Sequence, residues 1–248
     1  MAGAAWVTPS VLTRDQASAY SGVCGATQTM AWPTASGITS PPGGNAAATS
    51  FSNWDITLSG VKVRVSFTTG GGVVRRGQGI ATLGNVAAAD NFQINKDAAP
   101  LNADATIQLD FVDPVTNAAR SVGDFDVTLL DVDKSCNNSG GNGTFTDQVI
   151  VAATLNAAAV TPTTVTLNNT FVTQSPAGTF TGISDASGTG NTGGNVRLQY
   201  TGKFITRITF TYRSAQAVSC GGGNCGCSPG TNRASTDQYF GINEFTFC

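Results

Sequence analysis

Apolar and polar residues alternate along most of this chain with a period of two. The clearest runs cover 56–67, 105–111, 195–200, 204–212 and 239–247, and they are rich in Val, Ile, Thr and Phe. This period, carried by β-branched and aromatic residues, is typical of strands with one buried side and one side facing solvent. Each run is therefore predicted to be a strand.

Turn-forming residues separate these runs. Clusters of Gly, Pro, Asn and Ser occupy 40–45, 69–72, 184–195 and 221–230, and only 14–20 has a helical period. We expect an all-β fold of about ten strands in two antiparallel layers, a β-sandwich of the jelly-roll type.

The chain is expected to form a single domain with an extension. Its 248 residues are enough to bury a large core. No linker or long repeat divides it, and the Pro- and Gly-rich stretch at 37–47 is the one seam. We interpret 1–50 as an N-terminal arm that packs on the sandwich or on a neighbouring molecule, and 51–248 as the sandwich.

Three aspartates mark a candidate metal site. Asp131 and Asp133 close an apolar strand, and a loop of small polar residues at 134–146 leads to Asp147, which opens the next strand. Side chains two apart on a strand point the same way. Oxygen-only ligands suit a hard cation such as Ca²⁺, although solvated aspartates at strand ends are the alternative.

Charge and composition argue against several functions. The net charge is −2 and only 11% of residues are charged. This composition does not indicate a basic surface for binding nucleic acid or an anionic membrane. No apolar run approaches the ~20 residues of a membrane span. The chain has no histidine and a single glutamate, Glu244, so catalysis based on imidazole is excluded and a pair of catalytic acids is not apparent. We expect no enzyme.

Six cysteines indicate an oxidising environment: Cys24, Cys136, Cys220, Cys225, Cys227 and Cys248. A zinc cluster is the alternative, but its usual pair spacing and its histidines are missing. Disulfides are expected, and six cysteines allow 15 pairings. One arrangement joins Cys24 to Cys248 and cross-links the remaining four. A secreted protein is implied, and because residues 1–6 lack the features of a signal peptide, the exported form would have lost its leader.

The order of these motifs resembles a known domain. A turn at 113–117 is followed by the aspartate-rich strand 124–133, the Asp-Gln-Val-Ile-Val strand 147–151 and a closing Phe-rich strand at 240–247. This is similar to the jelly-roll β-sandwich domain of bacterial secreted and cell-surface, adhesin-like proteins, with its D-x-D…D-x-V calcium-site pattern, over roughly 55–248. The resemblance implies that Asp131, Asp133 and Asp147 bind a structural Ca²⁺. The cysteine-rich loop at 220–227 departs from the pattern.

A structural or adhesive role at the cell surface is the function we expect. The protein could form fibres with copies of itself by donating a strand from its arm, and the donor candidates are Trp6, Val7, Val11 and Leu12. The alternative is a carbohydrate-binding module that recognises a cell-surface glycan through exposed aromatic residues. Its platform candidates are Tyr20, Trp32, Trp54 and Tyr239, although core or arm packing is the favoured interpretation of each.

Overall fold

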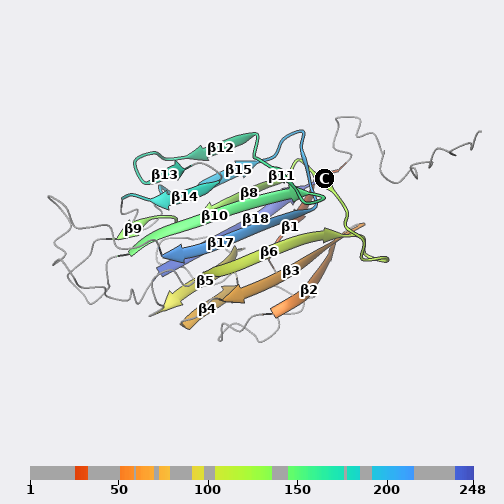
Figure 1. The fold of residues 1–248 in the computed structure, drawn as a ribbon, viewed down its shortest axis with the longest axis horizontal. Helices are drawn as coiled ribbons and strands as arrows, with labels where there is room; N and C mark the ends of the chain where they lie inside the picture. The colour runs from red at the N-terminus through yellow and green to blue at the C-terminus, as the bar shows by residue number, and fades with distance from the viewer. Residues whose placement is uncertain are drawn as a thin grey trace, which may run out of the picture.

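Two antiparallel sheets packed face to face make up the protein (Figure 1). The computed structural model describes residues 26–32, 51–58, 60–69, 73–78, 91–97, 104–135, 145–175, 178–184, 192–214 and 238–248. All regular elements in these ranges are strands, and no helix there could cross a membrane. The predicted all-β, two-layer antiparallel sandwich is confirmed.

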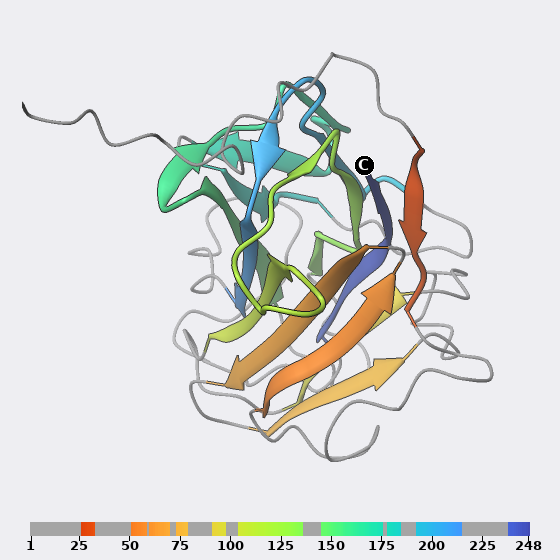
Figure 2. The same cartoon turned by 90° about the vertical axis from the view of Figure 1, so that its right-hand side faces the viewer.

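The first sheet has seven strands. Their order is β12 (Thr164–Leu167), β15 (Val196–Gln199), β8 (Asp126–Leu130), β18 (Gln238–Phe247), β5 (Asn91–Asp97) and β4 (Val73–Gln78), with β1 (Gln28–Met30) pairing with β18. Figure 2 shows β1, in red, beside the dark-blue end of β18.

The second sheet has nine strands. Their order is β13 (Val172–Ser175), β14 (Thr179–Gly182), β10 (Phe145–Leu155), β17 (Arg207–Ser214), β6 (Ala105–Val112), β3 (Val61–Thr69) and β2 (Phe51–Leu58); β9 (Lys134–Ser135) and β11 (Ala158–Val160) also pair with β10. A small separate sheet joins β16 (Phe204–Ile205) to β7 (Val122–Gly123).

The core lies between the two sheets and is rich in aromatic rings. Alternate residues of the central strands enter it, as β6 shows with its regular change between buried and half-buried positions. Rings from opposite sheets meet there: Tyr212 stacks on Phe240 with 5.1 Å between ring centroids, and Phe111 packs against the edge of Phe247 at 5.4 Å. Aromatic pairs of this kind add stability beyond the area that they bury.

Part of the N-terminal region belongs to the sandwich. Strand β1 pairs with the last residues of β18. Trp32 is fully buried, packs against Trp54 and Phe92, and donates a hydrogen bond from Nε1 to the carbonyl of Asn243 at 3.0 Å. Residues 1–25 and 33–50 lie outside the described ranges, and with them the donor-strand candidates Trp6, Val7, Val11 and Leu12.

One predicted strand is a hairpin. The alternating run 56–67 was expected to be continuous, but β2 ends at Leu58 and β3 begins at Val61, with Leu58 opposite Val61. Gly60 has a φ of +77°, in the left-handed region that glycine enters without steric cost. The prediction was wrong because a two-residue turn preserves the alternation of the two strands that it joins.

In two further predicted strands the alternation of buried and exposed positions is interrupted. The run 204–212 breaks at Thr206, whose N–H and hydroxyl both donate to the carbonyl of Thr154, so β16 and β17 join different sheets. In β18 the register shifts between Ile242 and Phe245, and both residues are buried although three positions separate them. A β-bulge of this type turns the strand so that both ends of it face the core.

Candidate functional site

The three predicted metal ligands gather at one end of the sandwich. Strand β8 ends at Leu130, residues 131–133 cross from the seven-stranded sheet to β9, and β9 pairs with the start of β10, where Asp147 lies. Asp147 is completely buried, Asp133 is 5% exposed and Asp131 is half-buried. The loop therefore brings Asp147 back against Asp133, as the sequence predicted.

The backbone conformation at Asp131 differs from the prediction. Asp131 was expected to continue the strand, but it has a φ of +65°, a conformation that Asp tolerates better than most residues. The chain leaves the sheet at this point, and Val132 donates its N–H to the carbonyl of Gly194 at 2.9 Å. Strand alternation therefore does not orient Asp131 and Asp133.

Asp147 is held by several protein groups. Its Oδ1 accepts a hydrogen bond from the hydroxyl of Tyr212 at 2.7 Å, and its Oδ2 lies 3.4 Å from the N–H of Asp133. Its own N–H donates to the carbonyl of Asp133 at 2.9 Å. These contacts connect β10, β17 and the 131–133 crossing into one buried polar unit.

The electrostatics of this unit disfavour ionised Asp147. Burial raises the pKa of Asp147 well above its usual range, the carboxylates of Asp133 and Asp131 raise it further, and the bond from Tyr212 opposes this. Burial also raises the pKa of Tyr212, with Asp147 adding to the effect. A proton or a cation placed near Asp147 would relieve the repulsion.

The described part of the chain contains no complete set of metal ligands. Among the described residues, no group of three or more His, Cys, Asp or Glu side chains is arranged to hold a metal ion. One oxygen of Asp147 already accepts from Tyr212. Calcium binding by Asp131, Asp133 and Asp147 therefore stays a prediction from the sequence.

Of the six cysteines, Cys248 lies in the part of the chain that the structure describes. It is disulfide-bonded, and its backbone exchanges two hydrogen bonds with Gly123 at 2.9 and 3.0 Å. The other five cysteines, Cys24, Cys136, Cys220, Cys225 and Cys227, its partner among them, fall outside the described ranges. The pairing of Cys24 with Cys248 stays a prediction.

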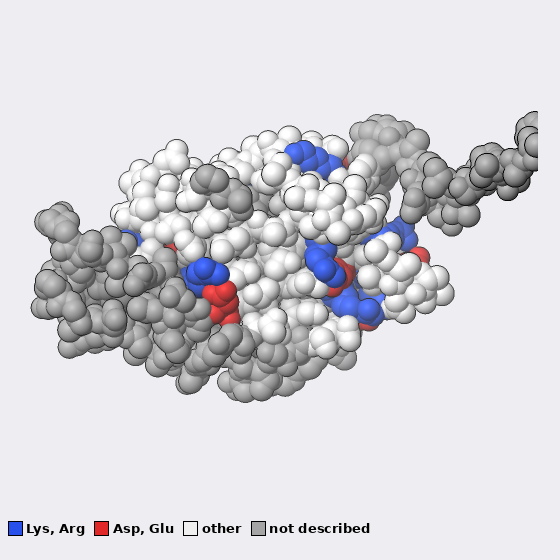
Figure 3. All heavy atoms as spheres, viewed as in Figure 1, with Lys and Arg blue, Asp and Glu red and all other residues white. Residues whose placement is uncertain are grey.

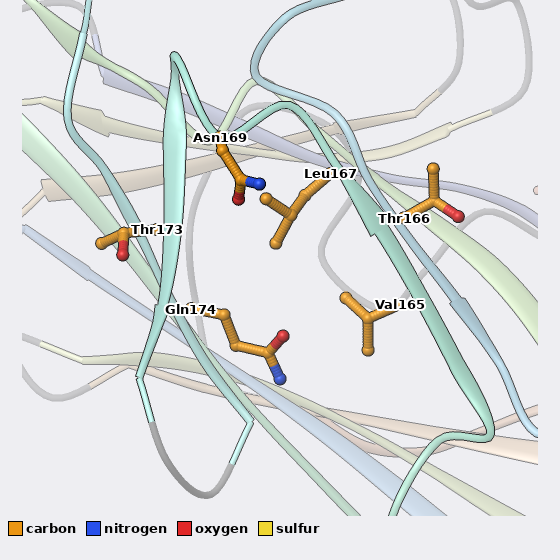
Figure 4. A pocket seen from close by; sticks show the side chains of 6 residues that line it. All are labelled: Val165, Thr166, Leu167, Asn169, Thr173 and Gln174. Atoms are coloured by element: carbon orange, nitrogen blue, oxygen red, sulfur yellow. The ribbon is translucent and has the colours of Figure 1, made fainter.

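The sequence did not reveal an open cleft at one margin of the sandwich, which we call the edge cleft. It lies between β12, the last strand of the seven-stranded sheet, and β13, the last strand of the nine-stranded sheet, and has a volume of about 410 Å³. In Figure 4, Val165 and Leu167 point into it from β12, and Gln174 reaches into it from β13. Thr166 and Thr173 point away from the space between the strands.

Two of the aromatic platform candidates are core residues. Trp32 is completely buried and Trp54 is 3% exposed, and their rings stack with 6.2 Å between centroids. Neither can offer a face to a ligand. The side chains of Tyr20 and Tyr239 are outside the described part. A sugar platform built on Trp32 or Trp54 is therefore excluded.

A second hollow, the arginine groove, lies on the outer face of the nine-stranded sheet. It has a volume of about 360 Å³, and its polar lining residues are Arg64, Asp110, Asn117, Thr154, Asn156, Thr206 and Arg207. The alternation places Arg64, Asp110 and Arg207 on the solvent side of their strands. It could not show that they meet, because it does not encode strand order.

Comparison with known proteins gives distant structural similarity only. No protein-family model and no curated protein matches the chain. It is similar to the N-terminal domain of an adhesin of Streptococcus gordonii, with 12% identity and a TM-score of 0.39 over 79% of this chain and 45% of that structure. It is also similar to glucan-binding protein C of Streptococcus mutans, with 11% identity and a TM-score of 0.35 over 75% of this chain and 51% of that structure.

An adhesin domain of Lys-gingipain from Porphyromonas gingivalis matches with 13% identity and a TM-score of 0.27, over 81% of this chain and 98% of that structure. The chain spans about half the length of the two streptococcal structures. TM-scores at this level do not assign a shared fold, so functional inference rests on the residues of this chain.

Proposed function

We propose that this protein is a secreted, cell-surface structural and adhesive domain that acts by binding and self-association, with no catalytic role. The observation that carries the proposal is the edge cleft, where both sheets end side by side and leave a space of about 410 Å³. The low fraction of charged residues, 11%, and the disulfide at Cys248 suit a durable extracellular material.

The edge cleft has the features of an acceptor for an extended strand. Within the described chain, β12 pairs only with β15 and β13 pairs only with β14. An edge strand presents backbone N–H and C=O groups on its open side, and another chain can pair with them. Val165 and Leu167, two positions apart on β12, would contact alternate side chains of an inserted strand.

The proposed donor is the arm of a second copy. Residues 5–12 contain Trp6, Val7, Val11 and Leu12, apolar side chains that suit a cleft floored by Val165 and Leu167. Pro9 lacks an N–H and would have to face away from the pairing strand or sit at a bulge. Repeated insertion from copy to copy is a head-to-tail contact, which builds a filament when the rotation does not close into a ring.

The alternative function is a carbohydrate-binding module. The amide groups of Asn169 and Gln174 favour it, because they supply donors and acceptors for sugar hydroxyls in the same cleft. In that case the protein would remain a monomer, and the edge cleft would hold a neutral glycan in place of a strand from a second copy.

The test is a matched pair of substitutions on β13. Gln174→Trp fills the edge cleft, whereas Thr173→Trp places the same side chain on the opposite side of the strand, and both positions are exposed. By light scattering after size exclusion, wild type and Thr173→Trp are expected to assemble and Gln174→Trp to remain monomeric. Equal assembly by all three proteins would reject insertion at this cleft.

Calcium is kept as part of the proposal on the strength of the sequence pattern. If Ca²⁺ binds Asp131, Asp133 and Asp147, binding stabilises the fold by mass action. A chelator should then lower the Tm of wild type and leave Asp133→Ala, which has already lost a ligand, unchanged. A Tm of wild type that does not respond to chelator or to added Ca²⁺ rules the metal out.

A further inference from the structure

The arginine groove contains a row of charges that crosses the sheet. Arg64 of β3 lies opposite Asp110 of β6, and Asp110 lies opposite Arg207 of β17. Asp55 of β2 extends the row beyond Arg64, and Thr154 of β10 extends it beyond Arg207. Positive and negative side chains therefore alternate over four neighbouring strands and end in a hydroxyl.

Ion pairs fix the two arginines in place. Arg64 binds Asp55 through Nε at 2.8 Å and Nη2 at 3.0 Å, and the same Nη2 donates to Oδ1 of Asn117 at 2.9 Å. Arg207 binds Asp110 through Nε. Figure 3 shows Lys or Arg atoms next to Asp or Glu atoms on this otherwise mostly uncharged face. The guanidinium planes are thus oriented before any ligand arrives.

The guanidinium of Arg207 can still donate hydrogen bonds to a ligand. A guanidinium carries five N–H donors in a planar fork. Among the described residues, its hydrogen bond is the one from Nε to Asp110, and its side chain is 51% exposed. Its two Nη groups can therefore donate to a ligand while Nε keeps the side chain anchored.

The local charge favours an anion. Three cationic side chains, Lys62, Arg64 and Arg207, face two carboxylates, Asp55 and Asp110, which leaves a local excess of +1 on a chain of net charge −2. Lys62 belongs to this cluster because it lies 3.2 Å from Asp55 and also donates to Asn117. A carboxylate would match both the excess charge and the fork of Arg207.

The uncharged lining residues suit sugar hydroxyls. Asn117 and Asn156 lie in turns with φ of +60° and +50°, and Thr154 adds a hydroxyl at the end of the charged row. Amides and hydroxyls can both donate and accept, as a sugar ring requires. We propose that the arginine groove binds carboxylate-bearing sugar units of an acidic polysaccharide, with Arg207 holding the carboxylate.

This inference is independent of strand insertion, because it uses other strands and other residues than the edge cleft. Its probe is tetragalacturonate, and the fully methyl-esterified form of the same oligosaccharide is the neutral control. Arg207→Gln is the test variant. Arg197→Gln is the matched control, because Arg197 is 53% exposed and pairs through Nε and Nη2 with Asp126, but lies on β15 of the other sheet.

Calorimetric titration should give binding of tetragalacturonate to wild type and Arg197→Gln with the same Kd, and a Kd at least about tenfold higher for Arg207→Gln. Arg207→Lys, which keeps the charge without the fork, should fall between the two. The ester should not bind. Absence of binding to wild type, equal weakening by both glutamine variants, or equal affinity for the ester would overturn the inference.

Discussion

At Gly182, beside the aspartates, two backbone segments approach each other very closely. A Cβ added to Gly182 of β14 would lie 2.0 Å from the carbonyl oxygen of Asp133 and 2.1 Å from its carbon. Because both contacts are to backbone, no side chain can move away to make room. The absence of a side chain at Gly182 therefore allows the 131–133 crossing to pack on β14.

Gly182→Ala should destabilise the protein by about 3 kcal/mol, the upper end of the usual cost of overpacking. Gly123→Ala is the control, since its added Cβ would meet the ring of Phe204 at 3.2 Å and a side chain can shift. Urea unfolding measures both free energies of unfolding. Equal losses for the two variants would mean that the contact with Asp133 is not tight.

The ion pair of Asp55 makes stability depend on pH. The hydrogen bonds from the Arg64 guanidinium lower the pKa of Asp55, Lys62 lowers it further, and partial burial opposes both. Because the folded pKa lies below the unfolded value of about 3.9, the pair stabilises the fold above that pH, and this contribution is lost as the pH falls through the folded pKa.

Asp55→Asn should therefore lower the free energy of unfolding at neutral pH by about 0.2–1 kcal/mol, the usual range for a solvent-accessible pair. The difference from wild type should disappear in acid, below the lowered pKa. Denaturant unfolding over a pH series measures it. A difference that stays constant from neutral pH into strong acid would show that the charge on Asp55 is not its source.

At the scale of elements, alternation located strands well and their boundaries less well. The run 105–111 became β6 without change, because no turn residue interrupts it. The run 56–67 became two strands, because the turn at Gly60 keeps the alternation in phase. The spacing of Ile242 and Phe245 is the one visible trace in the sequence of the β18 bulge.

Of the candidate sites, one could be predicted from the sequence and one could not. Clustering of Asp133 and Asp147 could be inferred, since residues 134–146 alone separate them in the chain. The arginine groove could not, because Arg64, Asp110 and Arg207 are far apart in the chain and meet only through the order β3, β6, β17. The burial of Trp32 also depends on a pairing between distant segments, β1 and β18.

Trp32→Ala tests whether the segment 26–32 is an integral part of the fold. The substitution removes a fully buried ring, its contacts with Trp54, Phe92 and Phe245, and its hydrogen bond to Asn243. We expect a loss of about 3–5 kcal/mol in the free energy of unfolding. A loss below about 1 kcal/mol, the range of surface substitutions, would mean that this segment packs only loosely.

At the scale of the whole molecule, the two surfaces that we propose for binding are distinct. The edge cleft exposes the open sides of two edge strands, and the arginine groove lies on the outer face of the nine-stranded sheet. The first suits an extended chain and the second an acidic sugar. If both proposals hold, the domain joins its own copies through the edge cleft and attaches them to an acidic polymer through the arginine groove.

The most direct test of self-association is electron microscopy of the wild-type protein beside a variant that lacks residues 1–12. Strand insertion predicts filaments for wild type, and single particles with an unchanged Tm for the deletion, because the donor is lost while the sandwich is kept. Filaments formed equally by the deletion variant, or a wild-type protein that stays monomeric at every concentration, would contradict it.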